Sequence, residues 1–85
     1  MHIEFEHMPQ YLIFEGYQDG YYKKTETIVK MDKVVCISRT NNEVTITLDT
    51  HNQPSVYSFT VDEKSAEKIM DLFKQYIKDY YTVKD

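Results

Sequence analysis

Residues 31–61 read MDKVVCISRTNNEVTITLDTHNQPSVYSFTV, and this stretch decides the fold. Two β-rich runs, VVCIS and VTITL, flank the dipeptide Asn41-Asn42. A two-residue hairpin turn of the primed type is expected to have positive φ at both central residues, and Asn tolerates positive φ better than any other residue except glycine. With this dipeptide as the turn, Ile37 lies opposite Ile46 in an antiparallel pair.

A second hairpin follows, closed by the loop HNQP at residues 51–54. Its register places Ile46 opposite Phe59, on the same face as Ile37. The further facing pairs are Val35 with Leu48, Leu48 with Tyr57, and Val44 with Val61. A slip of one residue in either hairpin would move a whole apolar row to the opposite face. Because both loops independently place the same residues on one face, the sequence predicts a run of adjacent antiparallel strands.

Residues 25–31 are also rich in β-branched side chains, which predicts a further strand upstream. If Asp32-Lys33 forms a tight turn, Ile28 lies opposite Ile37 and extends the same apolar face. The reverse face then carries an apolar corner that consists of Val29, Met31, Val34, Cys36 and Val56. We expect either the N-terminal strands or a second protein chain to cover this corner, because contiguous exposed apolar area usually marks an interaction site.

The N-terminal part of the chain is less decisive. Residues 2–7 alternate between apolar and polar side chains, which predicts a half-buried strand that ends before Pro9. The apolar run at residues 11–14 is compatible with a buried strand or with short helical turns, and we favour the strand. Residues 16–20 contain both glycines of the chain and predict a turn.

After Val61 the hydrophobic pattern changes to the period of a helix. Asp62 is a suitable N-cap, and the predicted helix runs over residues 63–80. Its apolar stripe consists of Ala66, Ile69, Met70, Phe73, Ile77 and Tyr80, and we expect it to cover the face formed by Ile37, Ile46 and Phe59. The predicted fold class is therefore α+β: an antiparallel β-meander of about five to six strands packed against one C-terminal amphipathic α-helix. A single domain spans residues 1–85.

The composition restricts the class of protein. The net charge is −4, from 14 acidic and 10 basic side chains, and this argues against a nucleic-acid partner because the phosphate backbone is also negative. The single cysteine cannot form an internal disulfide, and no apolar run reaches transmembrane length, so we expect a cytoplasmic protein outside the membrane. Many Lys, Tyr, Ile and Asn residues with few Ala and Gly residues suit an AT-rich genome, which points to a bacterial or phage source.

Catalytic and cofactor-binding motifs are absent from the sequence. Cys36 falls inside a β-rich run, where a free thiol behaves as a small apolar side chain rather than as a nucleophile. His2, Glu4 and Glu6 share one face of the predicted first strand, but they lack the spacing of a recognised metal motif. The two glycines are too few for a glycine-rich phosphate loop. We therefore expect no enzyme activity, no metal site and no cofactor.

Tyrosine is in excess, with eight Tyr and no Trp in the chain. Several tyrosines gather around the glycine turn, where no core is predicted. Exposed tyrosines supply contact area with a polar tip and are enriched at protein interfaces. The candidate partner-binding residues are Tyr17, Tyr21, Tyr22, Lys23, Val29, Met31, Val34 and Val56.

These observations predict a small non-enzymatic protein-interaction module, an adaptor or an inhibitor such as a phage or mobile-element accessory protein. Its expected partner is another protein, or a second copy of itself in a homodimer. The alternative is a small-ligand or nucleotide-binding domain, in which the tyrosine-rich loop forms an aromatic and cationic rim around the ligand.

Overall fold

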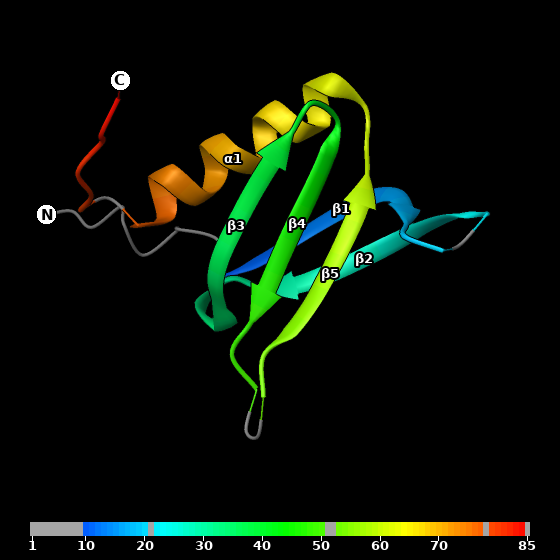
Figure 1. Ribbon diagram of the computed structural model, residues 1–85, viewed down its shortest axis with the longest axis horizontal. Coiled ribbons are helices and arrows are strands. Elements are labelled where there is room, and N and C mark those ends of the chain that lie inside the picture. Colours follow the sequence, from blue (N-terminus) through cyan, green and yellow to red (C-terminus); the bar gives the residue numbers. More distant parts are fainter. Residues whose placement is uncertain (1–9, 21, 51–52, 78, 85) are drawn as a thin grey trace, which may run out of the picture.

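The computed structural model of the chain describes residues 10–20, 22–50, 53–77 and 79–84. Its strands are β1 (Tyr11–Gln18), β2 (Lys24–Lys30), β3 (Val34–Thr40), β4 (Glu43–Leu48) and β5 (Ser55–Thr60), followed by the helix α1 (Glu63–Ile77). The strands form one antiparallel sheet in the order β2-β1-β5-β4-β3 (Figure 1). The predicted α+β class, with an antiparallel sheet and one C-terminal helix, is confirmed. The strand predicted at residues 2–7 lies outside the described residues.

The β3–β4 hairpin has the predicted register, with Ile37 opposite Ile46. Asn41 adopts a φ of 55°, and it alone among the described non-glycine residues has a positive φ. Positive φ was expected at both central residues of this turn, and that is wrong for Asn42. Positive φ at the first central residue alone is the requirement of a type II′ turn. The expected pairing of Val35 with Leu48 is wrong, because the register shifts at a β-bulge and Val34 faces Leu48 instead.

The β4–β5 hairpin is shifted by two residues from the predicted register. Val44 faces Phe59 and Ile46 faces Tyr57, so the connecting loop is longer than residues 51–54. A shift of two residues keeps every side chain on its original face, since successive side chains alternate. The face was therefore predicted correctly although the individual partners were not.

The largest correction concerns β2, which was expected to pair with β3 through a tight turn at Asp32-Lys33. These residues belong instead to a short 3-10 turn, Met31–Lys33, that connects strands at opposite edges of the sheet. β2 pairs along its whole length with β1, so Ile28 faces Ile13 rather than Ile37.

The run at residues 11–14 is a strand, as favoured, and it continues through the predicted turn as far as Gln18. The actual turn begins at Asp19 and uses Gly20 at a φ of 88°. β1 pairs with β5 only at its end, where Tyr17 and Gln18 face Thr60 and Phe59. From there the β1–β2 hairpin diverges from β5 and crosses behind β5 and β4 (Figure 1). The sheet therefore folds back on itself as two layers.

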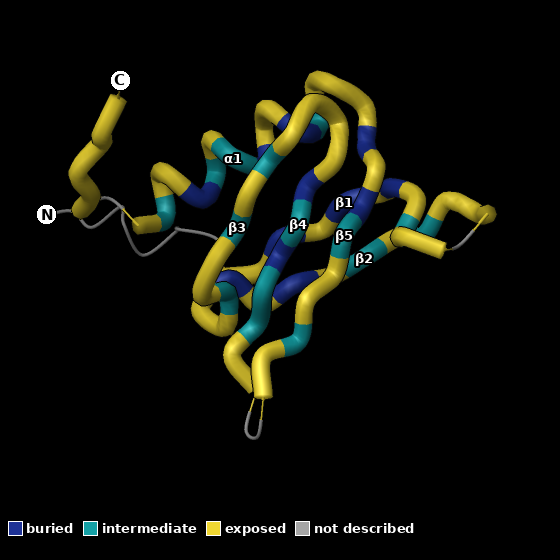
Figure 2. The backbone as a smooth tube through the Cα atoms, in the orientation of Figure 1, coloured by how far each residue is buried: buried dark blue, intermediate teal, exposed yellow. Residues whose placement is uncertain are grey.

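The core lies between these layers and the helix (Figure 2). Phe14 of β1 meets Phe59 of β5 edge to face, with ring centroids 5.0 Å apart. The buried side chains are Leu12, Phe14, Val29, Met31, Val44, Ile46, Phe59, Val61, Ala66, Ile69 and Phe73, with Ile37 packed at the margin. The helix thus covers part of the predicted apolar face, and β1 covers the rest of it. It begins after the predicted cap Asp62, whose Oδ1 accepts a hydrogen bond from Ser65 N at 2.7 Å, and it ends at Ile77 rather than residue 80.

Candidate functional site

The outer face of the β1–β2 hairpin is the most distinctive surface of the described chain. In β1 the side chains of odd-numbered residues are exposed, and in β2 those of even-numbered residues are exposed. The antiparallel register brings the two sets onto one face. We call this surface the hairpin face; it consists of Tyr11, Ile13, Glu15, Tyr17, Lys24, Glu26, Ile28 and Lys30.

Cross-strand partners give the hairpin face a defined chemical pattern. Ile13 lies opposite Ile28, and these side chains are 58% and 62% exposed. On one side of this apolar pair Tyr11 faces Lys30, and on the other Glu15 faces Glu26. Directly opposed like charges destabilise a strand pair, whereas opposed aliphatic side chains stabilise it. The hairpin face therefore presents an apolar centre, Ile13 and Ile28, beside an acidic pair, Glu15 and Glu26. No positive charge lies directly opposite either carboxylate in this cross-strand pair.

The backbone at the free edge of β2 can be assigned from one hydrogen bond. In an antiparallel pair, positions alternate between those that exchange backbone hydrogen bonds and those that do not. Met31 N donates to Gln10 O at 2.8 Å, which makes these residues a bonded pair. Counting back along β2, Lys30, Ile28 and Glu26 are not bonded to β1, so their N–H and C=O groups point to the free edge.

A cleft of about 250 Å³ borders this edge. It is lined by Gln18, Thr27, Ile28, Val29, Ile46, Leu48, Tyr57 and Phe59. On the sheet side, Leu48 is half-buried and Tyr57 is exposed, although both lie on the core face of their strands. The lower parts of β4 and β5 extend past the β1–β2 layer, which accounts for this exposure (Figure 1). An unpaired strand edge therefore lies beside an uncovered apolar wall.

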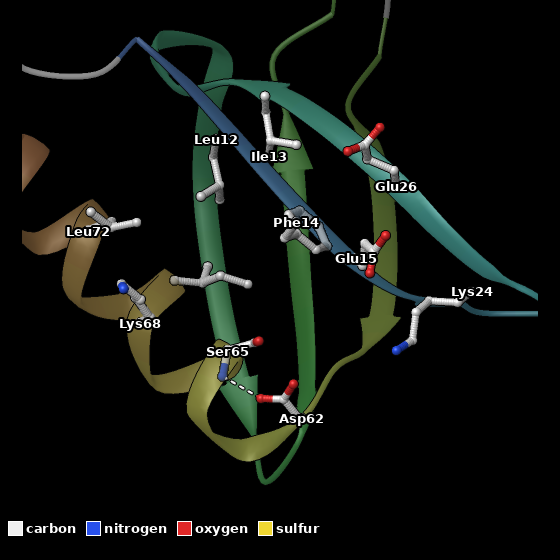
Figure 3. Close-up of a pocket in the computed structure, with 11 residues that line it drawn as sticks. Leu12, Ile13, Phe14, Glu15, Lys24, Glu26, Asp62, Ser65, Lys68 and Leu72 are labelled. Atoms are coloured by element: carbon white, nitrogen blue, oxygen red, sulfur yellow. Dashed lines mark hydrogen bonds between the residues drawn. The ribbon is translucent and has the colours of Figure 1, made fainter.

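A second cleft, of about 490 Å³, separates β1 from α1 (Figure 3). Lys68 and Ser65 line its helix side, while Glu15 and Lys24 line its strand side. The backbone N–H of Ser65 donates a hydrogen bond to Asp62 and holds the pKa of that carboxyl below its usual value, with smaller contributions that include the positive charge of Lys24. Capping of the helix explains this shift.

The predicted partner-binding residues do not form one surface. Tyr17 lies on the hairpin face, and Tyr22 and Lys23 are exposed in the β1–β2 loop. Tyr21 lies outside the described residues. Val29 and Met31 are 6% and 2% exposed and lie in the core with Leu12 and Phe14 of β1, so a strand from the N-terminal part of the chain covers this part of the corner, as the first alternative expected. These two residues are therefore wrong as partner-binding residues.

The rest of the corner is divided by the β-bulge in β3. Val34 turns inward and packs against the core, while Val35 and Cys36 are exposed. Val56 is exposed on the outer face of β5, near polar side chains such as Thr45 and Ser58, whose hydroxyl oxygens are 2.9 Å apart. This outer face is therefore mostly polar and carries scattered rather than contiguous apolar residues.

Sequence reasoning missed the central residues of the hairpin face. Ile13 was taken as a core residue of a buried run, and Ile28 was placed in the core opposite Ile37. The sequence signal that could have identified them is the alternation of side chains within residues 11–18 and 24–30. If the segment between these two runs is treated as a hairpin loop, the alternation places Ile13 and Ile28 on the same face of one hairpin.

Comparisons with protein-family models, with curated proteins and with solved structures gave no match for this chain. Within the described residues, no cluster of His, Cys, Asp and Glu side chains is arranged to hold a metal ion. The helix that the structure describes is also too short and too polar to cross a membrane.

Proposed function

We propose that this chain is a small non-enzymatic protein-interaction module that binds another protein chain through the hairpin face. The observation that carries the proposal is the exposed pair Ile13 and Ile28, in which Ile28 lies on the edge strand β2 and Ile13 lies beside Tyr11 on the neighbouring strand β1. Scattered exposed aliphatic residues are ordinary on a protein surface, but contiguous ones beside an unpaired edge favour association. Tyrosine at the border suits an interface, because its ring is apolar and its hydroxyl tolerates water.

An adaptor or an inhibitor acting in the cytoplasm fits this surface, and a phage or mobile-element accessory protein is one concrete form. The composition supports this setting, because the single cysteine is compatible with a reducing compartment. Such a protein would act by occupying the surface of its partner, so its own surface needs shape and apolar area rather than reactive groups.

Association measured with matched variants tests the proposal. Ile13→Asp places a charge at the centre of the hairpin face, whereas Val35→Asp places the same charge at a similarly exposed aliphatic position on β3. Light scattering of the purified chain should detect self-association, and chemical crosslinking in a bacterial lysate should detect a complex with another protein. Ile13→Asp should abolish the complex that is found, and Val35→Asp should preserve it. A protein that remains monomeric and forms no crosslinked complex, or a complex that both variants lose equally, would contradict the proposal.

The alternative, a small-ligand or nucleotide binder, has less support. Tyr22 is 97% exposed, and neither it nor Lys23 lines the clefts beside β2 and α1. Thermal-shift screening with nucleotides separates the two functions, because a ligand at about a hundred times its dissociation constant adds about 2.7 kcal/mol of stability. A specific shift that is lost on Tyr22→Ala would favour the alternative.

A further inference from the structure

We propose that β2 pairs edge to edge with β2 of a second copy of this chain, antiparallel, with Ile28 opposite Ile28 of the second copy. This inference names the partner of the hairpin face and therefore rests on the function proposed above. Three observations carry it: the position of β2 at the edge of the sheet, the direction of its free backbone groups, and the order of charges along its exposed face.

The two-fold symmetry of such a pair restricts the possible registers. Side chains of the exposed face must lie opposite one another, because otherwise an apolar or charged row would turn into the core. The exposed face of β2 reads Lys24, Glu26, Ile28, Lys30. A register that places Glu26 opposite itself, or Lys24 opposite Lys30, sets like charges against each other and is disfavoured.

Two registers place Glu26 opposite a lysine. Pairing it with Lys24 joins only residues 24–26, the beginning of the strand. Pairing it with Lys30 joins residues 26–30 and sets Ile28 opposite itself at the two-fold axis. The longer register therefore gives an opposite-charge pair on each side of an apolar centre, and we assign it to the dimer.

The backbone geometry agrees with this register. Glu26, Ile28 and Lys30 are the positions whose N–H and C=O groups point away from β1. In the proposed pair each of them lies opposite another such position, so each donates and accepts a backbone hydrogen bond across the interface. Backbone pairing of this kind is the usual way in which a free strand edge is satisfied by another chain.

The side chains gain from the same arrangement. Ile13, Ile28 and their counterparts in the second copy form one continuous apolar row across the joined sheets. Lys30 of the second copy supplies the positive charge that the Glu15–Glu26 row lacks. Lys30 makes a long contact of 3.9 Å with Asp32, and the two side chains are 44% and 53% exposed, so little is lost when this contact is exchanged for one across the interface.

Sedimentation or light scattering over a concentration series tests the pairing. The wild-type chain is expected to form a dimer at high concentration. Ile28→Lys sets two ammonium groups opposite each other at the two-fold axis, which should raise the dimer dissociation constant by roughly tenfold or more. Val56→Lys is the matched control, because Val56 is 61% exposed against 62% for Ile28 and lies on β5. It should leave the dissociation constant unchanged.

A charge-reversal experiment tests the register itself. Glu26→Lys gives a chain with lysine at both charged positions of the interface, and Lys30→Glu gives a chain with glutamate at both. Each variant alone should be monomeric where the wild type is dimeric. An equimolar mixture should form a one-to-one heterodimer, since every lysine then faces a glutamate. Recovery on mixing cannot come from a misfolded variant, and circular dichroism of each variant alone checks the fold independently.

The outcomes separate this inference from the function on which it rests. A strictly monomeric wild type, a dimer indifferent to Ile28→Lys, or variants that fail to recover on mixing would each overturn the pairing. If Ile13→Asp still abolishes a complex with a different protein in those cases, the interaction function stands with a partner other than a second copy of this chain. If Ile13→Asp also has no effect, the proposed function fails as well.

Discussion

Gly16 occupies the point where β1 leaves β5, and replacing it with alanine should destabilise the fold. A Cβ atom built at Gly16 would lie 2.6 Å from Val61 Cγ1 and 2.9 Å from Thr60 O. Val61 is β-branched and buried, so its side chain has little freedom to move, and the carbonyl oxygen belongs to the backbone. Either β1 or the end of β5 must therefore shift to accept the methyl group.

The size of the effect follows from two opposing terms. Overpacking of this kind costs about 1–3 kcal/mol, whereas a strand glycine replaced by alanine without a clash gains about 0.4–1 kcal/mol through the unfolded state. We expect a net loss of about 1–2 kcal/mol in the free energy of unfolding. For a domain of this size, that loss lowers Tm by roughly 4–16 °C. Urea and thermal unfolding followed by circular dichroism measure both quantities.

Two controls identify the cause. Adding Val61→Ala to Gly16→Ala removes one of the two contacts, so the double variant should lose less stability than the sum of the single variants. Gly20 has a φ of 88° and open space around it, so Gly20→Ala should be destabilising through backbone strain, and Gly20→Asn should be milder. A Gly16→Ala variant as stable as the wild type would refute the close crossing of β1 over the end of β5.

Further predictions concern the core, the helix cap and the acidic pair. Ile46→Val should lower the free energy of unfolding by about 0.5–1.5 kcal/mol because it removes a buried methyl group, whereas Ile13→Val should change it by less than about 0.5 kcal/mol; chemical denaturation compares them. Asp62→Ala should lower Tm at neutral pH. Because the folded-state pKa of Asp62 is lowered, its contribution is present above its ordinary value of 3.8 and is lost as pH falls through the folded-state pKa, so the two Tm values should converge in acid. Glu15→Gln should raise stability by about 0.2–1 kcal/mol at low salt by removing repulsion from Glu26, and the gain should shrink in thermal melts at high salt.

Part of the proposed site was predictable from the residues alone. Tyr17 was expected at a surface because it lies beside the glycine turn, and it is on the hairpin face. Ile28 was assigned to the core through the assumed tight turn at Asp32-Lys33, and Ile13 through the interpretation of residues 11–14 as a buried strand. Exposure of these residues depends on which side of the β1–β2 hairpin the rest of the sheet covers, and no local pattern contains that information.

The sequence by itself determined the β3–β4 hairpin, the face that Ile37, Ile46 and Phe59 share, and the helix that starts after Asp62. These features depend on alternation, turn residues and helical spacing, which act over a few residues and survive a register shift of two. The tertiary structure alone decided that β2 pairs with β1, which buries Val29 and leaves Ile28 at the surface. The reason is physical: strand order results from competition between distant pairings, and the pairing that closes the two layers over Phe14 and Phe59 buries the core.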